Sequence, residues 1–458
     1  MGRRSLSPPP LSITQEKKVF VFLLQVRDTL ENHRVYLFTV FIALVWIVWL
    51  RKVQLSCRYR PYAEDFTTTT SVVIPVVDEP EALFREVLQR IVAQQPDEVI
   101  VVINGPRNTR LERICDEFES VRWVWTEVAG KRNAVRIGVE AAHGEVVLLV
   151  DSDTIWTEGT MRELVKPFAD PRVGGATTRQ RILAPERHVL TRWADWMENL
   201  RNEYSMPAMS VLGTVGCLPG RTIAFRRKVL LDAMPAFLHA KFLGVFLEVS
   251  DDRTLTNETL KQGYRTVYQS TSVVYTDAPI TWRKMAKQQL RWARGSQYNT
   301  LRMLPWMLRH SRTLAFFYIC DILLPFLLLC SVTGWLFRMW TSNDEDIFAG
   351  FVGRYGEEYG YLLVVGLTML MGALSSAIRQ SRHLAQRPSD FFRLPAYLLI
   401  GTFFLTPIRL LGFVRMAYAS GWGTRAGGYS GERVRNPKAH IPLFIAMALV
   451  VAGTLVHT

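Results

Sequence analysis

The chain has 458 residues and a formal net charge of +14, so it has room for two or three domain-sized units and is strongly basic. Its basic residues gather beside apolar segments instead of forming one stripe, which excludes nucleic acid as the expected partner and favours a membrane protein. The five cysteines are odd in number and never form a C-x-x-C pair. Neither a disulfide framework nor a zinc site is therefore predicted.

Apolar segments long enough to approach a membrane span occur on both sides of a long polar region. A spanning helix needs about 17–25 mostly apolar residues. The segment 1–34 that precedes the first of them is basic, and part of it is predicted to lie on the membrane surface. The predicted transmembrane helices are 35–50, 313–338, 361–378 and 441–456.

A further apolar segment, 393–418, is interrupted by Pro395 and Pro407 and carries Arg409. The loops before and after it are both basic, which places both on the cytosolic side. Two consecutive cytosolic loops cannot be separated by a single crossing, so this segment is predicted to be an interfacial or re-entrant helix. An ordinary spanning helix remains the alternative. Residues 419–439 follow it as a loop.

The polar region 65–280 alternates short apolar runs with helical stretches, which is typical of an α/β domain with a mostly parallel sheet. The predicted strands are 71–76, 98–103, 121–125 and 145–150, and the predicted helices are 80–93 and 131–142. The chain has no G-x-G-x-x-G after the first strand and no G-x-x-x-x-G-K-[ST]. A dinucleotide dehydrogenase and a P-loop ATPase are therefore excluded.

Polar side chains follow three of these strands. Asp78, Asn104 and Asp151 all fall at carboxyl ends, where ligands bind in parallel sheets. In Asp151-Ser152-Asp153, carboxylates at a strand end are suited to hold Mg²⁺ or Mn²⁺, which in turn bridges two phosphates. Asp153 is the predicted metal ligand, and Asp151 is predicted to face a nucleotide. The alternative is an acidic turn without a ligand.

A second acidic group, Ser250-Asp251-Asp252, precedes a predicted helix. Transfer to a hydroxyl group with inversion needs one carboxylate that removes the proton, and Asp252 is the predicted general base. A helix N-cap at Ser250 or Asp251 is the structural alternative, and both roles are compatible.

The basic amphipathic stretch 281–312 contains Gln288, Arg291 and Trp292, whose spacing puts them on one face of a helix. An arginine there can pair with a diphosphate, and a tryptophan can form a flat wall for a sugar ring. Arg294 is a further diphosphate candidate, and Lys131 opens a helix where a phosphate could bind. A membrane-surface helix is the alternative for this stretch.

In these motifs the chain resembles the processive family 2 glycosyltransferases, the group of the hyaluronan, chitin and cellulose synthases. The resemblance is strongest to the hyaluronan-synthase-like branch. The resemblance extends from about residue 71 to the C-terminus. It rests on IPVVDEP, AGKRNA, VDSDT, GCLPGR, SDDRTLTN, QQLRWARG and WGTR. Two departures are Val77, where an aromatic residue is usual, and Asn104, where an aspartate is common.

The resemblance implies a GT-A-type catalytic domain between membrane helices, with Asp252 as base and Asp153 on Mg²⁺ or Mn²⁺. It implies acceptor binding by Trp292 and Asp251, and a mobile loop over the donor. The residues implied in nucleotide binding are Asp78, Asn104, Lys131, Asp151, Gln288, Arg291 and Arg294, and those implied in the gating loop are Trp422, Gly423, Thr424 and Arg425.

The resulting hypothesis is a multi-pass plasma-membrane enzyme whose catalytic domain faces the cytosol. It would transfer sugar from a nucleotide sugar, UDP-linked in the resemblance, to a growing β-linked polysaccharide and help to export it. One rival is an enzyme that adds a single sugar to a membrane lipid. The other, of a different class, is an inactive membrane scaffold or transport subunit, whose signature would be a broken set of acids.

Overall fold

The computed structural model describes residues 37–341, 353–418 and 436–457. The chain divides into two compact units. The larger unit comprises Val48–Cys320 and Val365–Leu443, and the smaller comprises Met1–Ile47, Asp321–Val364 and Phe444–Thr458. Every predicted site residue that the structure describes lies in the larger unit.

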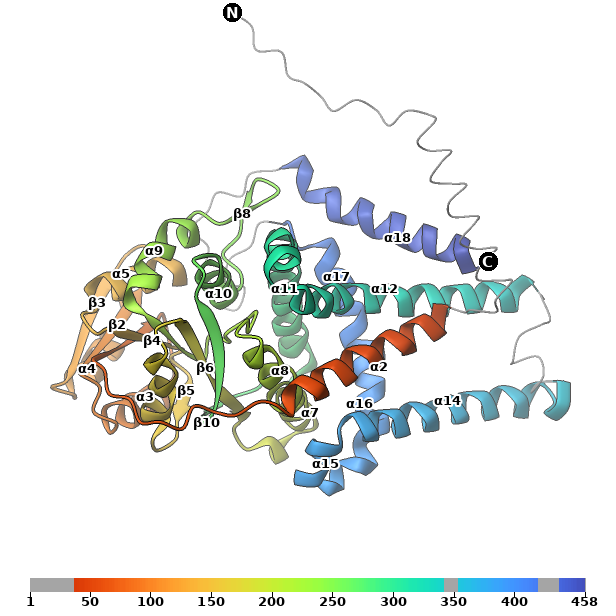
Figure 1. Cartoon of the computed structure of the whole chain (residues 1–458), viewed down its shortest axis with the longest axis horizontal. Coiled ribbons are helices and arrows are strands. Elements are labelled where there is room, and N and C mark those ends of the chain that lie inside the picture. Colours follow the sequence, from red (N-terminus) through yellow and green to blue (C-terminus); the bar gives the residue numbers. More distant parts are fainter. Residues whose placement is uncertain (1–36, 342–352, 419–435, 458) are drawn as a thin grey trace, which may run out of the picture. The chain divides into compact units, whose positions relative to one another are not determined.

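The larger unit is built on an eight-stranded sheet with the order β3-β2-β1-β4-β7-β6-β10-β5 (Figure 1). The strands β3, β2, β1 and β4 are parallel, as the sequence predicts, whereas β7 runs antiparallel to both β4 and β6. The strands are β1 Thr70–Val76, β2 Glu98–Asn104, β3 Val121–Thr126, β4 Val146–Val150, β5 Thr154–Trp156, β6 Val173–Ile182, β7 Thr222–Arg226 and β10 Arg265–Thr276. A small hairpin is formed by β8 Lys241–Phe242 and β9 Val245–Phe246.

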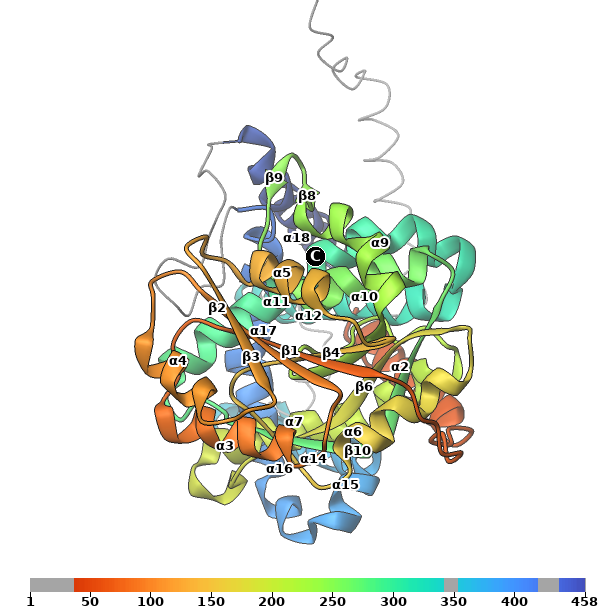
Figure 2. The same cartoon turned by 90° about the vertical axis from the view of Figure 1, so that its left-hand side faces the viewer.

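Helices cover both faces of this sheet, which explains why its central strands are apolar on both sides (Figure 2). One face packs against α3 Glu81–Val92, α4 Thr109–Asp116 and α6 Thr160–Val165. The other packs against α5 Lys131–Ala141, α8 Met206–Val211, α9 Arg227–Leu238 and α10 Asp251–Lys261. The predicted strands and helices of the first half of the domain are thus confirmed to within a residue or two at each end.

The apolar segments form helices: α2 Leu37–Ser56, α12 Arg312–Thr341, α14 Glu357–Arg379 and α18 Ile441–His457. Within the described residues, five helical segments are long and apolar enough to cross a membrane. The fifth is Pro388–Val414, the segment for which the loop charges predict an interfacial position.

This fifth segment is irregular, as its prolines lead one to expect. It consists of the 3-10 helix η4 Pro388–Arg393, α16 Leu394–Leu399, the π-helix η5 Ile400–Leu405 and α17 Thr406–Val414. It packs along α11 Trp282–His310 within the larger unit. There the Gln297 side chain donates a hydrogen bond to the Arg409 carbonyl at 3.0 Å. The apolar segment is therefore attached to the helix that carries the Q-x-x-R-W motif.

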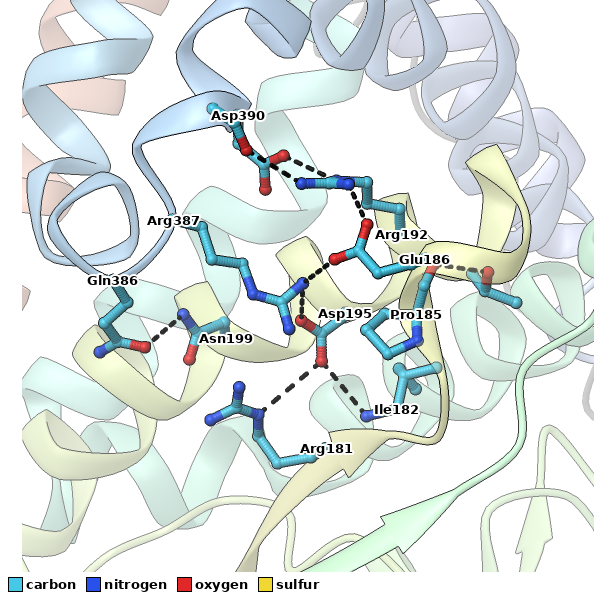
Figure 3. Close-up of polar contacts among 12 residues, drawn as sticks. Arg181, Ile182, Pro185, Glu186, Arg192, Asp195, Asn199, Gln386, Arg387 and Asp390 are labelled. Atoms are coloured by element: carbon cyan, nitrogen blue, oxygen red, sulfur yellow. Dashed lines mark hydrogen bonds and ion pairs between the residues drawn. The ribbon is translucent and has the colours of Figure 1, made fainter.

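A buried network of charges joins α7 Val189–Leu200 to the segment just before α16 (Figure 3). Asp390 is fully buried and accepts hydrogen bonds from Arg192 Nε at 2.8 Å and from the His383 ring at 2.9 Å. One helical turn along α7, Asp195 pairs with Arg387 at 3.1 Å. Helix α7 is thus held through ionic contacts on the same side that faces residues 383–390.

Candidate active site

The predicted residues at the strand ends lie at one edge of the sheet. Asn104 ends β2, while Asp78 and Asp151 follow β1 and β4. Because β2, β1 and β4 are parallel neighbours, their carboxyl ends form a common edge. The sequence prediction of a site at this edge is therefore supported by the position of all three residues.

Lys131 is the first residue of α5, after Gly130, whose φ of 127° requires glycine. Its ammonium group forms a close ion pair with the Asp151 carboxylate. Burial lowers the pKa of Lys131, but Asp151, Asp251 and Asp252 together raise it above its usual value. The lysine is therefore a permanent positive charge among carboxylates.

Gly220 is the point at which the predicted donor and base residues meet. A Cβ atom placed on Gly220 would lie 3.4 Å from Asp252 Cβ, 3.8 Å from Lys131 Nζ and 3.9 Å from Asp151 Oδ2. These residues also line a cavity of about 20 Å³. The structure thus brings together Lys131, Asp151 and Asp252, which are far apart in the sequence.

Both oxygens of Asp252 accept hydrogen bonds. Oδ1 accepts from the backbone N–H of Arg253 at 2.8 Å and from the Ser250 hydroxyl at 3.2 Å. Oδ2 accepts from the backbone N–H of Gly220 at 3.2 Å, and the Cys217 thiol lies 3.8 Å away. These donors fix the direction of the carboxylate, as a general base needs. Burial, then Asp252, raises the pKa of Cys217 to about 12, so the thiol stays protonated and can donate.

Asp251, the neighbouring acid, points to a different partner. It forms a buried ion pair with Arg132 at 2.7 Å, and Arg132 also donates to the Phe237 carbonyl at 2.8 Å. Burial lowers the pKa of Arg132, but Asp251, Tyr298 and Glu248 together raise it above its usual value. Although Asp251 lines the cavity, its carboxylate is therefore held by α5, whereas that of Asp252 is held at Gly220.

A strained backbone presents these two acids. Ser250 precedes α10 in the left-handed conformation, with φ 63° and ψ 59°, which is unfavourable for a residue with a side chain. Gly295 of α11 packs against it, and a Cβ atom on Gly295 would lie 2.5 Å from Ser250 Cβ. The absence of a side chain at Gly295 thus allows α11 to approach the turn that carries Asp251 and Asp252.

Helix α11 brings Arg291 to the acidic groups. Four carboxylates, those of Asp151, Asp153, Asp251 and Asp252, act on its guanidinium, but burial outweighs them and lowers the pKa of Arg291. Among the residues that the structure describes, its buried Nε has no hydrogen-bond partner. Gln288, one turn earlier, is half-buried. The site therefore contains a half-buried arginine whose Nε–H the described residues leave without an acceptor.

Trp292 lies beside Arg291 and has 38% of its surface exposed. The guanidinium of Arg221 lies 5.9 Å from the centre of its ring. One side of the ring is thus covered by the protein, and part of its surface remains open, as the sugar-wall prediction requires.

A divalent metal fits this edge only together with a ligand. No group of three or more His, Cys, Asp or Glu side chains is placed to hold a metal ion in the described part of the chain. Asp153 follows β4 immediately before β5, and carboxylate oxygens are ligands that Mg²⁺ and Mn²⁺ accept. Because Asp151 is already paired with Lys131, a metal would have Asp153 as its protein ligand and take further oxygens from phosphates.

Three predicted residues have their polar groups directed elsewhere. Asp78 is exposed and contacts Asn108 at 3.2 Å. Asn104 is fully buried, donates to the Val76 carbonyl and accepts from the Gly130 N–H, so it ties β1 to the start of α5.

Arg294 donates hydrogen bonds to the backbone carbonyls of Arg415 and Tyr418, and burial lowers its pKa to about 10. Its guanidinium thus holds the chain after α17 instead of facing the acids. The predicted gating residues Trp422, Gly423, Thr424 and Arg425 lie outside the described residues, and their role stays a prediction.

The sequence reasoning missed Arg132, Arg221 and Gly295 as site residues. Arg132 and Arg221 lie inside the motifs AGKRNA and GCLPGR, and Gly295 ends QQLRWARG. Their position inside these motifs was the signal in the sequence that could have identified them.

Comparisons with known proteins concern the domain that carries this site. The sequence profile described as "Glycosyltransferase like family 2" matches residues 68–295. The chain is 26% identical to a hyaluronan synthase of Streptococcus pyogenes over 421 residues, which cover 89% of this chain and 96% of that protein. It is 31% identical to an N-acetylglucosaminyltransferase of Azorhizobium caulinodans over 242 residues, 51% of this chain and 61% of that protein.

Among solved structures, the mannosyltransferase PcManGT from Pyrobaculum calidifontis, in complex with GDP-Man and Mn²⁺, resembles this chain with a TM-score of 0.53. The likeness has 18% identity and covers 83% of this chain and 99% of that one. It confirms the GT-A-type fold. The profile match spans the sheet, both acidic groups and the Q-x-x-R-W motif in the first half of α11. The chain is therefore a glycosyltransferase with a family 2 catalytic domain and resembles the hyaluronan synthases.

Proposed function

We propose that this membrane protein is an inverting glycosyltransferase that moves sugar from a cytosolic nucleotide sugar, UDP-linked, to a growing β-linked polysaccharide and helps to export the product. The convergence of Lys131, Asp151 and Asp252 around Gly220 carries the proposal. It puts a phosphate-binding cation and a fixed carboxylate at one strand end, which is what donor binding and proton removal require together.

The donor diphosphate binds between α5 and α11. Lys131 and the N-terminal end of α5 supply positive charge from one side. Arg291, whose Nε–H has no acceptor within residues 37–341, 353–418 and 436–457, supplies it from the other. Asp153 would hold Mg²⁺ or Mn²⁺, and the bound ion would supply positive charge to offset that of the leaving diphosphate. The structural neighbour's Mn²⁺ and nucleotide sugar support a donor of this class. Gln288 adds a polar contact one turn along α11.

The nucleoside is assigned to the edge formed by β1 and β2. Asp78 is exposed there and Asn104 fixes the backbone beneath it. Asn104 therefore acts through the position of Gly130 and the α5 terminus. Asp78, whose contacts with Asn108 and Arg110 are at the surface, would exchange them for a ribose hydroxyl.

Transfer is a single displacement. The acceptor hydroxyl oxygen forms a bond with the anomeric carbon of the sugar while the bond from that carbon to the diphosphate oxygen breaks. Asp252 takes the hydroxyl proton, and the nucleoside diphosphate leaves with the electron pair. Attack from the face opposite the leaving group inverts the anomeric configuration. The hydrogen bonds to Asp252 keep its carboxylate directed during this step.

Trp292 provides a wall for the acceptor sugar. The S. pyogenes relative is a hyaluronan synthase over nearly its whole length, and the Azorhizobium relative is an N-acetylglucosaminyltransferase. The second name favours N-acetylglucosamine as a transferred sugar, and an enzyme that extends its own product would then meet it in the acceptor chain. The apolar helices, with Pro388–Val414 at the cytosolic interface of the plasma membrane, provide the path by which the product leaves.

The test is nucleoside diphosphate release from a panel of sugar nucleotides by the purified protein in lipid nanodiscs, with Mg²⁺ or Mn²⁺. Asp252→Asn is the matched blank, because it keeps the shape and most hydrogen bonds of Asp252. We expect release with one donor, reduced about 10²–10⁴-fold in the blank, with donor binding retained. Equal release in both proteins would reject Asp252 as the base.

The size of the product tests the second half of the proposal. A long polymer made without release between additions supports a polysaccharide synthase. A lipid that carries one added sugar would instead make the protein a single-addition enzyme. Release from no donor under any condition would favour an inactive membrane scaffold.

A further inference from the structure

Arg221 covers one side of the exposed Trp292 ring and is itself almost buried. Its guanidinium lies 5.9 Å from the ring centre, and only 11% of its side chain is exposed. Trp292 keeps 38% of its surface exposed. A guanidinium at this distance attracts the face of an indole and limits the rotation of the ring.

Two buried side chains hold Arg221 in place. Its Nη1 donates to Gln180 Oε1 at 2.7 Å and to Glu198 Oε1 at 3.0 Å. Gln180 is 1% exposed and also donates to the Pro219 carbonyl at 3.1 Å. Burial raises the pKa of Glu198, but Arg201 and Arg221 lower it below its usual value. Arg221 is thus fixed by β6 on one side and by α7 on the other.

The backbone of Gly220 and Arg221 contacts the two acids independently of the Arg221 side chain. The Arg221 carbonyl accepts from the Asp151 N–H at 3.0 Å, and the Gly220 N–H donates to Asp252. Neither contact uses the Arg221 side chain. A side-chain substitution at this position therefore disturbs Trp292 and leaves the backbone contacts to both acids available.

We propose that Arg221 is a positioning residue for acceptor recognition: held by Gln180 and Glu198, it sets the orientation in which Trp292 stacks against an acceptor sugar ring. The inference rests on the proposed function, because it takes Trp292 as the acceptor wall. The Nη1 group of Arg221 is occupied by Glu198 and Gln180, which fixes the guanidinium beside the indole. The ligand recognised through it is a pyranose ring of the growing chain.

The decisive variant is Arg221→Gln, which keeps a hydrogen-bonding side chain but removes the charge over the indole. We expect the KM for a β-linked N-acetylglucosamine tetrasaccharide to rise about tenfold, while the donor KM and donor hydrolysis change by less than about twofold. Arg179→Gln is the matched control. It breaks a comparable ion pair between β6 and Glu203, at 2.5 Å, and has no contact with Trp292.

A double-mutant cycle separates positioning from a merely structural role. If Arg221 acts through Trp292, then adding Arg221→Gln to Trp292→Leu raises the acceptor KM no further. Additive effects of the two substitutions would overturn the inference. So would a loss of donor hydrolysis equal to the loss of acceptor use in Arg221→Gln.

Removal of Arg221 leaves the buried Glu198 with Arg201 alone, so folding is monitored in parallel. Arg221→Gln keeps the Glu198–Arg201 ion pair, so its melting temperature is expected to stay within a few degrees of wild type. A loss of acceptor use that merely parallels a loss of folded protein would show that only the fold mattered and would overturn the inference.

Ligand-detected NMR of tetrasaccharide binding in nanodiscs distinguishes a failure of the proposed function from a failure of the role assigned to Arg221. The wild-type protein could turn over no donor and still bind the tetrasaccharide about tenfold more tightly than Arg221→Gln does. That result would reject the proposed function and support the role of Trp292 as the acceptor wall. If the wild-type protein turns over a donor but binds the tetrasaccharide no more tightly than Arg221→Gln does, only the role assigned to Arg221 is rejected.

Discussion

Two partly or largely buried arginines, Arg192 and Arg291, show opposite ways of using a charge. Arg192 donates from Nε to Asp390, from Nη1 to Glu186 and from Nη2 to Ser389. Arg291 lies among four carboxylates, yet its buried Nε has no hydrogen-bond partner among the described residues. Because a buried N–H without a partner is costly, an acceptor supplied by a ligand at Arg291 Nε would be favourable.

The difference separates a structural network from a binding site. Around Arg192 the protein provides an acceptor for each of the three guanidinium nitrogens, and the result is a fixed contact between α7 and the segment before α16. Around Arg291 four carboxylates lie nearby, and the Nε–H has no acceptor among the described residues. The diphosphate of the proposed donor would suit the second arrangement and not the first.

The largest expected effect is that of Arg291→Gln. Loss of one donor to the developing charge lowers turnover by about 10²–10³-fold. The melting temperature should change by no more than about 2 °C, because the side chain has an unsatisfied group in the folded state. Nucleoside diphosphate release and thermal unfolding in nanodiscs measure both quantities. A large drop in melting temperature with normal turnover of the remaining folded protein would remove the distinction between the two arginines.

Arg192→Gln is the matched counterpart and should have the reverse result. It breaks a buried ion pair with Asp390, which typically costs about 3 kcal/mol. We expect the melting temperature to fall by about 5 °C, with kcat of the folded fraction within about twofold of wild type. Turnover that falls as far as in Arg291→Gln would mean that the network contributes directly to the reaction.

Gly295→Ala should lower turnover by tens of fold, since its Cβ would lie 2.5 Å from Ser250 Cβ and displace the turn that carries Asp252. Ser250→Gly removes the opposing Cβ and also suits the positive φ of residue 250. The double variant should therefore recover most of the lost activity. Failure of Ser250→Gly to rescue Gly295→Ala would place the damage elsewhere on α11.

The smallest effect concerns pH. The folded-state pKa of Glu198 lies below its usual value of 4.5, so its ion pairs with Arg201 and Arg221 stabilise the fold above about pH 4.5. That stabilisation is lost as the pH falls through the lowered pKa. Glu198→Gln should lower the melting temperature by a few degrees at pH 7 and by less at pH 4. An equal difference at both pH values would contradict the ion-pair role.

Much of the fold follows from local pattern. The strands β1, β2 and β4 are short apolar runs that end in polar residues, and such runs belong to a sheet covered on both faces. The position of Asp78, Asn104 and Asp151 at a common edge follows from this pattern. The antiparallel β7 was not predicted, because its five residues resemble any short apolar run.

The direction of individual side chains could not be predicted. Asp251 and Asp252 are neighbours, and their different partners depend on Arg132 and Gly220, which are distant in sequence. Arg294 has the spacing of a site residue, but carbonyl groups beyond α17 take its hydrogen bonds. The role of Arg221 likewise arises only where β6, α7 and α11 meet.

The dipeptide Gly220–Arg221 touches the proposed base through its N–H group, the strand-end acid through its carbonyl and the indole through its side chain. An insertion or deletion here would shift donor and acceptor subsites together, so the two specificities cannot be redesigned one at a time by changing loop length. A change of the single codon for Arg221 acts on the acceptor alone. Laboratory evolution towards a new glycan chain with the same donor should therefore begin at that codon.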